Sequence, residues 1–286
     1  MRSCVLLYVY IQEGRWIING SFIDAIEYFL AIFENNKNTD LIFVGKIGSD
    51  RNDIINLIRD RYNLEGLTDW EDRVFFKKHY DLMKMKFKRV LIVDYTTIKM
   101  TKGLIRSEEI HVIVERYTEK KEYMFSKNTS NVTYWGEMPF EYREKEYRMK
   151  FLFDRIKKPE KVEDRVFLTF GPIIDSTGYP EKIKSEKYLK DLGINKEVFL
   201  KRTSSTEKFF EKFSTLVYIK TESSNWDTHP RIFVECSFFG KEIIYLNDLG
   251  IKDGSYYRYH DVLENGVKGR NLDKNDEIVS IFSKQN

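Results

Sequence analysis

Two carboxylates lie eight positions apart in the last third of the chain, with a proline between them. Asp227 precedes Pro230, and Glu235 follows it, in a segment whose other side chains are largely apolar. Pro230 suits the start of a helix and Gly240 the position just past its last turn, so the segment predicts a helix over residues 231–239. Asp227 then lies just before this helix, where free backbone N–H groups and the helix dipole attract anions. The start of the segment is therefore predicted to bind a phosphate group.

Glu235 falls at the edge of the apolar face of this helix rather than opposite it. With about 100° of rotation per residue, that face is formed by Ile232, Phe233, Cys236 and Phe239. A carboxylate at its edge is costly unless a hydroxyl, a cation or a backbone donor contacts it. One interpretation is that Glu235 binds a polyhydroxyl ring. The other is an ion pair with a neighbouring cation, with Asp227 as an ordinary helix cap.

The arrangement Asp227-x7-Glu235, with Pro230 between the acids and Gly240 beyond them, is similar to the acid-x7-Glu donor-binding signature of GT-B glycosyltransferases. The resemblance implies an α/β fold of two Rossmann-like domains with mainly parallel sheets and an inter-domain cleft. It also implies that Asp227 contacts the donor sugar and that Glu235 holds the ribose hydroxyls of the nucleotide. The co-substrate would be a nucleotide-sugar, a UDP-sugar in the favoured reading, with no tightly bound cofactor.

The remaining donor contacts are less well defined by the motif. By resemblance, the amides of Arg231 and Ile232 face the diphosphate, and His229 belongs to the same segment. The family's usual first acid is Glu, and a small glycine usually stands where this chain has proline. Its Arg/Lys pair is not found at a recognisable spacing. Because ligands of such folds bind at the carboxyl ends of strands, the candidates for that pair are basic residues that follow predicted strands: Lys201, Arg202 and Lys220.

Two acids of the amino-terminal half are candidates for a catalytic base. Glu13 lies in the polar loop after the first predicted strand, and Asp94 ends the apolar run that begins at Val90. Either carboxylate could take a proton from an acceptor hydroxyl as its oxygen attacks the anomeric carbon. Each could equally be a solvated loop acid. An enzyme that retains configuration needs no such base, and the sequence does not choose between inversion and retention.

The densest basic run of the chain, MKMKFKR over residues 83–89, suggests an acceptor. Its cations could contact the phosphates of DNA, or they could simply be solvated: Lys84, Lys86, Lys88 and Arg89. The size and composition of the chain resemble phage-encoded members of the GT-B superfamily, some of which glycosylate hydroxymethylated pyrimidines. That resemblance favours double-stranded DNA as acceptor, with a hydroxymethylcytosine-type base flipped into the site. A glycan or small-molecule acceptor, a nucleotide-sugar epimerase and a non-catalytic nucleic-acid-binding module are the alternatives.

The elements that must position these residues alternate between strands and helices. Strands are predicted over residues 4–10, 40–44, 90–98, 110–116, 165–170, 198–200, 216–219 and 242–246. Helices are predicted over residues 21–32, 52–62, 186–192, 204–213, 231–239 and 274–283. The strands are mostly apolar, which is typical of parallel sheets covered on both faces.

The charged stretch around Pro159 divides the chain in this reading. It predicts an amino-terminal Rossmann-like acceptor domain over residues 1–158 and a carboxy-terminal nucleotide-sugar-binding domain over residues 159–270. Residues 271–286 are predicted to form a helix that returns to the first domain.

Composition limits the remaining possibilities. Of 286 residues, 42% are hydrophobic and 15% aromatic, which is enough for a substantial core. The 48 Lys and Arg nearly balance the 45 Asp and Glu, so a nucleic-acid partner is allowed but not required. Two cysteines, no metal-ligand spacing among four histidines and no predicted membrane segment indicate a cytoplasmic protein without a metal site, in the host cytoplasm if phage-encoded.

Overall fold

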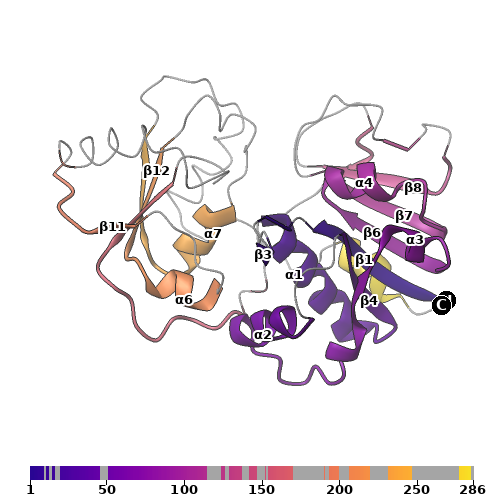
Figure 1. Cartoon of the computed structure of the whole chain (residues 1–286), viewed down its shortest axis with the longest axis horizontal. Helices are drawn as coiled ribbons and strands as arrows, with labels where there is room; N and C mark the ends of the chain where they lie inside the picture. The colour runs from indigo at the N-terminus through magenta and orange to yellow at the C-terminus, as the bar shows by residue number, and fades with distance from the viewer. Residues whose placement is uncertain are drawn as a thin grey trace. The chain divides into compact units, whose positions relative to one another are not determined.

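The computed structural model describes most of both halves of the chain. The described residues are 1–9, 11–12, 15–16, 20–45, 51–114, 124–125, 129–136, 142–146, 152, 154–169, 190, 193–199, 206–219, 231–246 and 277–284. The chain divides into two compact units (Figure 1). Unit 1 combines Met1–Ile156 with Leu272–Asn286, and unit 2 is Lys157–Asn271.

Unit 1 is built on a parallel sheet, seven-stranded within the described residues, in the order β5-β4-β1-β6-β7-β8-β9. All six pairings between its neighbouring strands are parallel. The strands are β1 (Arg2–Val9), β4 (Thr39–Gly45), β5 (Val74–Lys77), β6 (Phe87–Val93), β7 (Ser107–Val114), β8 (Val132–Gly136) and β9 (Lys145–Glu146). A short antiparallel ribbon, β2 (Ile11–Gln12) with β3 (Arg15–Trp16), follows β1.

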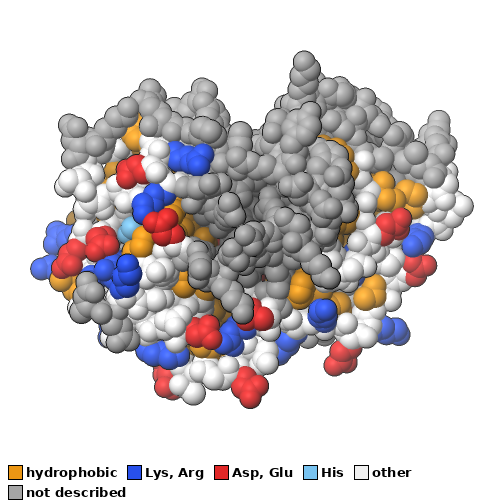
Figure 2. Space-filling view, turned by 180° about the vertical axis from the view of Figure 1, so that it is seen from behind, with side chains coloured by type: hydrophobic (Ala, Val, Ile, Leu, Met, Phe, Trp, Pro, Cys, Tyr) orange, Lys and Arg blue, Asp and Glu red, His pale blue; other side chains and the backbone are white. Residues whose placement is uncertain are grey.

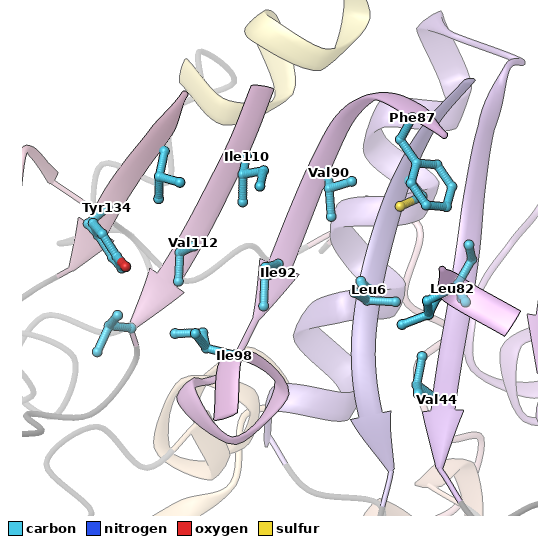
Figure 3. Close-up of a cluster of buried hydrophobic side chains, with 14 of the residues drawn as sticks. Leu6, Val44, Leu82, Phe87, Val90, Ile92, Ile98, Ile110, Val112 and Tyr134 are labelled. Atoms are coloured by element: carbon cyan, nitrogen blue, oxygen red, sulfur yellow. The ribbon is translucent and has the colours of Figure 1, made fainter. Parts of the chain in front are cut away.

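Helices cover both faces of this sheet. They are α1 (Gly20–Asn35), α2 (Arg51–Arg61), α3 (His79–Leu82), α4 (Tyr95–Thr101) and α9 (Glu277–Ser283), with a 3-10 turn, η1 (Glu71–Arg73). Leu82 of α3 and Ile98 of α4 pack with Leu6 and Ile92 in one apolar cluster (Figure 3). On the opposite face, Phe22 of α1 stacks on Phe43 of β4 with ring centroids 5.0 Å apart. Both sheet faces are therefore buried, as the apolar strands predict.

The strand order reverses between β1 and β6. From β1 the chain runs outward through β4 to β5, then returns to β6 beside β1 and runs outward the other way through β7 and β8. Such a reversal opens a crevice at the carboxyl ends of the two central strands, where ligands of open α/β sheets bind. In unit 1 those ends are Val9 of β1 and Val93 of β6.

Unit 2 repeats the principle with a smaller sheet. Its described strands are all parallel, in the order β11-β10-β12-β13. They are β10 (Val166–Thr169), β11 (Val198–Phe199), β12 (Thr215–Ile219) and β13 (Glu242–Leu246), with helices α6 (Thr206–Glu211) and α7 (Arg231–Phe238). Phe210 follows α6's line of aromatic residues and stacks 4.4 Å from Phe239 just after α7, which places both helices on one face. The order reverses between β10 and β12.

The structure confirms the predicted α/β class with mainly parallel sheets and corrects one element. Residues 90–98 are not one strand, because β6 ends at Val93 and α4 begins at Tyr95. Asp94 caps that helix, so the apolar and β-branched residues after it belong to a helix that packs on the sheet. The predicted helix over residues 186–192 lies mostly outside the described residues. Within the described part of the chain, no helix is long and apolar enough to cross a membrane.

Candidate functional site

Glu235 is buried in α7 and holds a buried cation. The Nε of Arg231 donates to its Oε1 at 3.0 Å, and both side chains are almost fully enclosed. The two residues are one helical turn apart, so the pair forms within α7 itself. Of the partners that the sequence allows for this carboxylate, the structure supplies a cation. A ribose at Glu235 would share the carboxylate with Arg231.

Local packing fixes the direction of α7. Phe233 contacts Tyr218 of β12 at 4.8 Å and Tyr245 of β13 at 6.1 Å between ring centroids. At the other end Gly240 has φ 67°, and the amide of Lys241 donates to the carbonyl of Cys236 at 2.9 Å. This is the glycine-terminated helix end that the sequence predicts. The start of α7, with the amides of Arg231 and Ile232, is thereby held after β12, a strand at the reversal of the unit 2 sheet.

Several predicted site residues lie outside the described part of the chain. They are Glu13, Lys201, Arg202, Lys220, Asp227 and His229. Their roles in donor binding and catalysis remain predictions.

Asp94 lies at the carboxyl end of β6, where the unit 1 sheet reverses. Its backbone has φ 71° and ψ 142°, a conformation that L residues rarely adopt, and only 7% of the residue is exposed. Its side chain accepts a hydrogen bond from the amide of Thr96 at 3.4 Å. Strained backbone of this kind is concentrated at functional sites because surrounding structure must hold it in place.

The next turn of the chain ties Asp94 to the neighbouring central strand. The hydroxyl of buried Thr97 accepts a hydrogen bond from the amide of Tyr8 at 2.9 Å. The carboxyl end of β1 is therefore fastened to the first turn of α4. Sequence reasoning missed Thr97, although its place just after a strand-ending acid is a signal for such a contact.

The basic run of residues 83–89 does not behave as a single patch. Lys84 and Lys86 are exposed and Lys88 is half-buried, whereas Arg89 is buried in β6. The Nε of Arg89 donates to Glu109 at 3.0 Å and its Nη1 to the carbonyl of Lys284 at 3.0 Å. Burial would raise the pKa of Glu109, but the hydrogen bond and charge of Arg89 hold it below the usual value. Arg89 is thus committed within unit 1, and an acceptor contact is restricted to the lysines.

An exposed tyrosine lies among the neighbouring lysines, and the sequence reading did not single it out. Tyr80 in α3 is 55% exposed. The ammonium groups of Lys78 and Lys84 lie 5.9 Å and 6.0 Å from its ring centroid. An aromatic face flanked by cations can stack a base or sugar while the cations contact phosphates.

Other charges in the described part of the chain show no second concentration of this kind on the face drawn in Figure 2. There, acidic and basic side chains are interspersed among the described residues. Within the described ranges, no group of three or more His, Cys, Asp or Glu residues is placed to hold a metal ion.

Comparison with known proteins gives one structural similarity. No family model matches the chain, and no curated protein sequence matches it. The crystal structure of UGT71G1 from Medicago truncatula complexed with UDP-glucose is similar over 99% of this chain and 93% of that chain. The sequence identity is 10% and the TM-score is 0.39.

Proposed function

We propose that this chain is a GT-B-type glycosyltransferase that moves a sugar from a nucleotide-sugar, a UDP-sugar in the first instance, to a hydroxyl acceptor. The observation that carries the proposal is the position of the acid-x7-Glu segment. It connects β12, a central strand at the reversal of a parallel sheet, to α7 and β13. Ligands of such sheets bind at this place, and the motif at this place has the residue types that a nucleotide-sugar needs.

Unit 2 is assigned the donor in this proposal. Asp227 would contact the sugar, and the first amides of α7 would face the diphosphate, whose negative charge a helix start favours. Glu235 would accept hydrogen bonds from the ribose hydroxyls while it keeps its ion pair with Arg231. The two units with separate parallel sheets support the GT-B arrangement.

Unit 1 is assigned the acceptor and the base. Asp94 would take the proton of the acceptor hydroxyl as its oxygen bonds to the anomeric carbon. The bond from that carbon to the diphosphate breaks, and the nucleoside diphosphate leaves with the electron pair. The strained backbone of Asp94 at the β1/β6 reversal supports its choice over an ordinary loop acid.

DNA carrying a hydroxymethylated pyrimidine is the proposed acceptor. Its support is the segment around α3, in which Tyr80 lies between Lys78 and Lys84, with Lys86 and Lys88 following. The same segment would equally serve a nucleic-acid-binding module without turnover, which is the second candidate function. A glycan or small-molecule acceptor and an epimerase reaction are tested alongside.

The test is a transfer screen with UDP- and GDP-sugars, with and without hydroxymethylcytosine DNA, and with glycan acceptors. Released nucleotide with a hexose or pentose mass gain on DNA would support the transferase and its acceptor together. Release with gain only on glycans would keep the transferase and remove the DNA acceptor. Donor isomerised without net release would indicate the epimerase. DNA binding with no turnover of any donor would leave the binding module.

Asp94→Asn is expected to lower kcat by at least about 100-fold, the usual contribution of a general base. Asparagine tolerates the same backbone conformation and can still cap α4, so the melting temperature should stay close to that of the native chain. Asp60→Asn, at an exposed position on α2, is the matched control and should retain full kcat. Full activity of Asp94→Asn would remove Asp94 from the base role without removing the transferase.

A further inference from the structure

A pocket of about 410 Å³ lies on unit 1 at the amino ends of the strands, the sheet edge opposite the one where Asp94 lies. Its lining comes from the start of β1, the end of α1 and the connection from α2 to β5. The lining residues are Arg2, Phe33, Lys37, Thr68, Asp69, Asp72, Arg73 and Phe75. Its volume is in the range of small-molecule sites.

One of the pocket's cations is already engaged in holding the structure together. Arg73 donates from Nε and Nη2 to the carbonyl of Lys37, at 3.1 Å and 2.7 Å, and from Nη2 to the amide oxygen of Asn38 at 3.2 Å. Its Nη1 also lies 3.3 Å from Asp40. Arg73 is therefore a fixed wall of the pocket, with its hydrogen-bonding capacity largely used.

Asp40 accounts for part of the remaining charge. It is 1% exposed, and its second oxygen lies 3.6 Å from Nη1 of Arg2. Neither of its oxygens accepts a hydrogen bond within the described structure. Asp40 thus holds Arg2 by charge alone, and the largely exposed guanidinium keeps its donors available.

The other charged side chains of the pocket have no counter-charge. Lys37 lies over the ring of Phe33 at 4.4 Å, but no carboxylate in the described ranges is within ion-pair distance of it. Asp69 and Asp72 are exposed, and neither pairs with a cation among the described residues. The pocket therefore presents donors and positive charge from Arg2 and Lys37, and negative charge from Asp69 and Asp72.

We propose that this pocket binds a small zwitterion, with its anionic group at Arg2 and Lys37 and its ammonium group at Asp69 and Asp72. A short methylene segment between the two charges would lie against the partly buried ring of Phe75. A ligand with charge of one sign would satisfy one pair and face repulsion from the other. The site is separate from the donor and acceptor residues of the proposed transferase and does not depend on that function.

The test measures binding of a matched set of probes to the full chain by calorimetry at low salt. The zwitterions are glycine, 4-aminobutyrate and 6-aminohexanoate, and the singly charged analogues are butyrate and n-butylammonium. We expect at least one zwitterion to bind tenfold or more tightly than both analogues, with an optimum in chain length. Equal binding of zwitterions and analogues, or binding of none, would overturn the proposal.

Two variants locate the binding. Asp69→Asn combined with Asp72→Asn should reduce the preference for the zwitterion over butyrate at least fivefold, and Lys37→Gln should reduce its preference over n-butylammonium. Asparagine tolerates the positive φ of 61° at residue 69, so folding should be preserved, which circular dichroism checks. Asp60→Asn is the control and should change neither preference. Zwitterion binding that survives both pocket variants would place the ligand elsewhere and overturn the assignment.

Discussion

The burial of His111 in β7 determines how one part of unit 1 responds to pH. The residue is 6% exposed, and its Nδ1 accepts a hydrogen bond from Nε1 of Trp135 at 3.2 Å. Burial lowers the pKa of His111 below the usual 6.5, although the Glu109 carboxylate acts in the opposite direction. The neutral ring is therefore the form that the folded state favours, as expected for a core histidine.

This lowered pKa predicts a loss of stability in acid. Below pH 6.5 the unfolded chain binds a proton that the folded chain does not, so stability falls with pH until the folded pKa is passed. The loss is about 1.4 kcal/mol for each unit by which the pKa is lowered. We expect the free energy of unfolding to fall more between pH 7.5 and pH 5 in the native chain than in His111→Gln. Urea denaturation at both pH values measures it, and identical slopes would contradict the prediction.

Residue-scale reasoning from the sequence placed His111 and Glu235 correctly in apolar surroundings, because hydrophobic periodicity is local. It could not identify their partners. Trp135 lies on the neighbouring strand β8, and Arg231 was considered only for its amide. The sequence did allow a cation at Glu235, but the choice between a cation and a hydroxyl depends on side-chain positions in the folded helix.

At the scale of elements, Glu27 joins α1 to the end of α2. This fully buried carboxylate accepts hydrogen bonds from the hydroxyl of Tyr62 at 2.7 Å and the amide of Leu152 at 2.9 Å. The guanidinium of Arg61 lies 3.8 Å away. The sequence predicted one apolar face for α1, whereas its side chains are buried from Ser21 to Phe33. The second buried face exists because segments distant in sequence cover it.

Glu27→Ala should destabilise unit 1 by about 3–5 kcal/mol, since it leaves the buried Arg61 without this carboxylate. Glu27→Gln should cost less, because an amide oxygen can still accept one of the two hydrogen bonds. Guanidinium denaturation of both variants measures the difference. The exposed change Glu34→Gln is a control for loss of a helix carboxylate on α1. A loss below about 1 kcal/mol in Glu27→Ala would show that the network contributes little.

At the scale of the whole molecule, the chain ends in the unit where it began. The carbonyl of Phe282 in α9 accepts a hydrogen bond from Nδ2 of Asn36 at 2.9 Å, and that of Lys284 accepts one from Arg89. The ring of Phe282 is fully buried, 5.3 Å from the ring of His111. Glu277 also pairs with Lys145. Unit 2 is thus inserted between two parts of unit 1.

Removal of residues after Asn271 should therefore weaken unit 1 and spare unit 2. Losing buried Ile278 and Phe282 should cost about 3–6 kcal/mol at 1.5–3 kcal/mol for each side chain. Hydrogen exchange followed by mass spectrometry should show faster exchange in β1 and β6 but unchanged exchange in β10 and β12. Phe282→Ala should show the same pattern weakly, and the exposed Ser280→Ala should not. Equal acceleration in both sheets would contradict the assignment of α9 to unit 1 alone.

The sequence by itself determined the alternation of strands and helices, the helix of α7 with its terminating Gly240, and the Asp227-x7-Glu235 spacing. These features depend on turn chemistry and periodicity within a few residues. Only the tertiary structure decided that β6 returns beside β1, so that Asp94 lies at a reversal of the sheet, and that Arg89 is buried against Glu109. It alone brought residues from Arg2 to Phe75 around one pocket. Strand pairing and the burial of charge join residues far apart in the chain, and local propensities carry no information about which of them will meet.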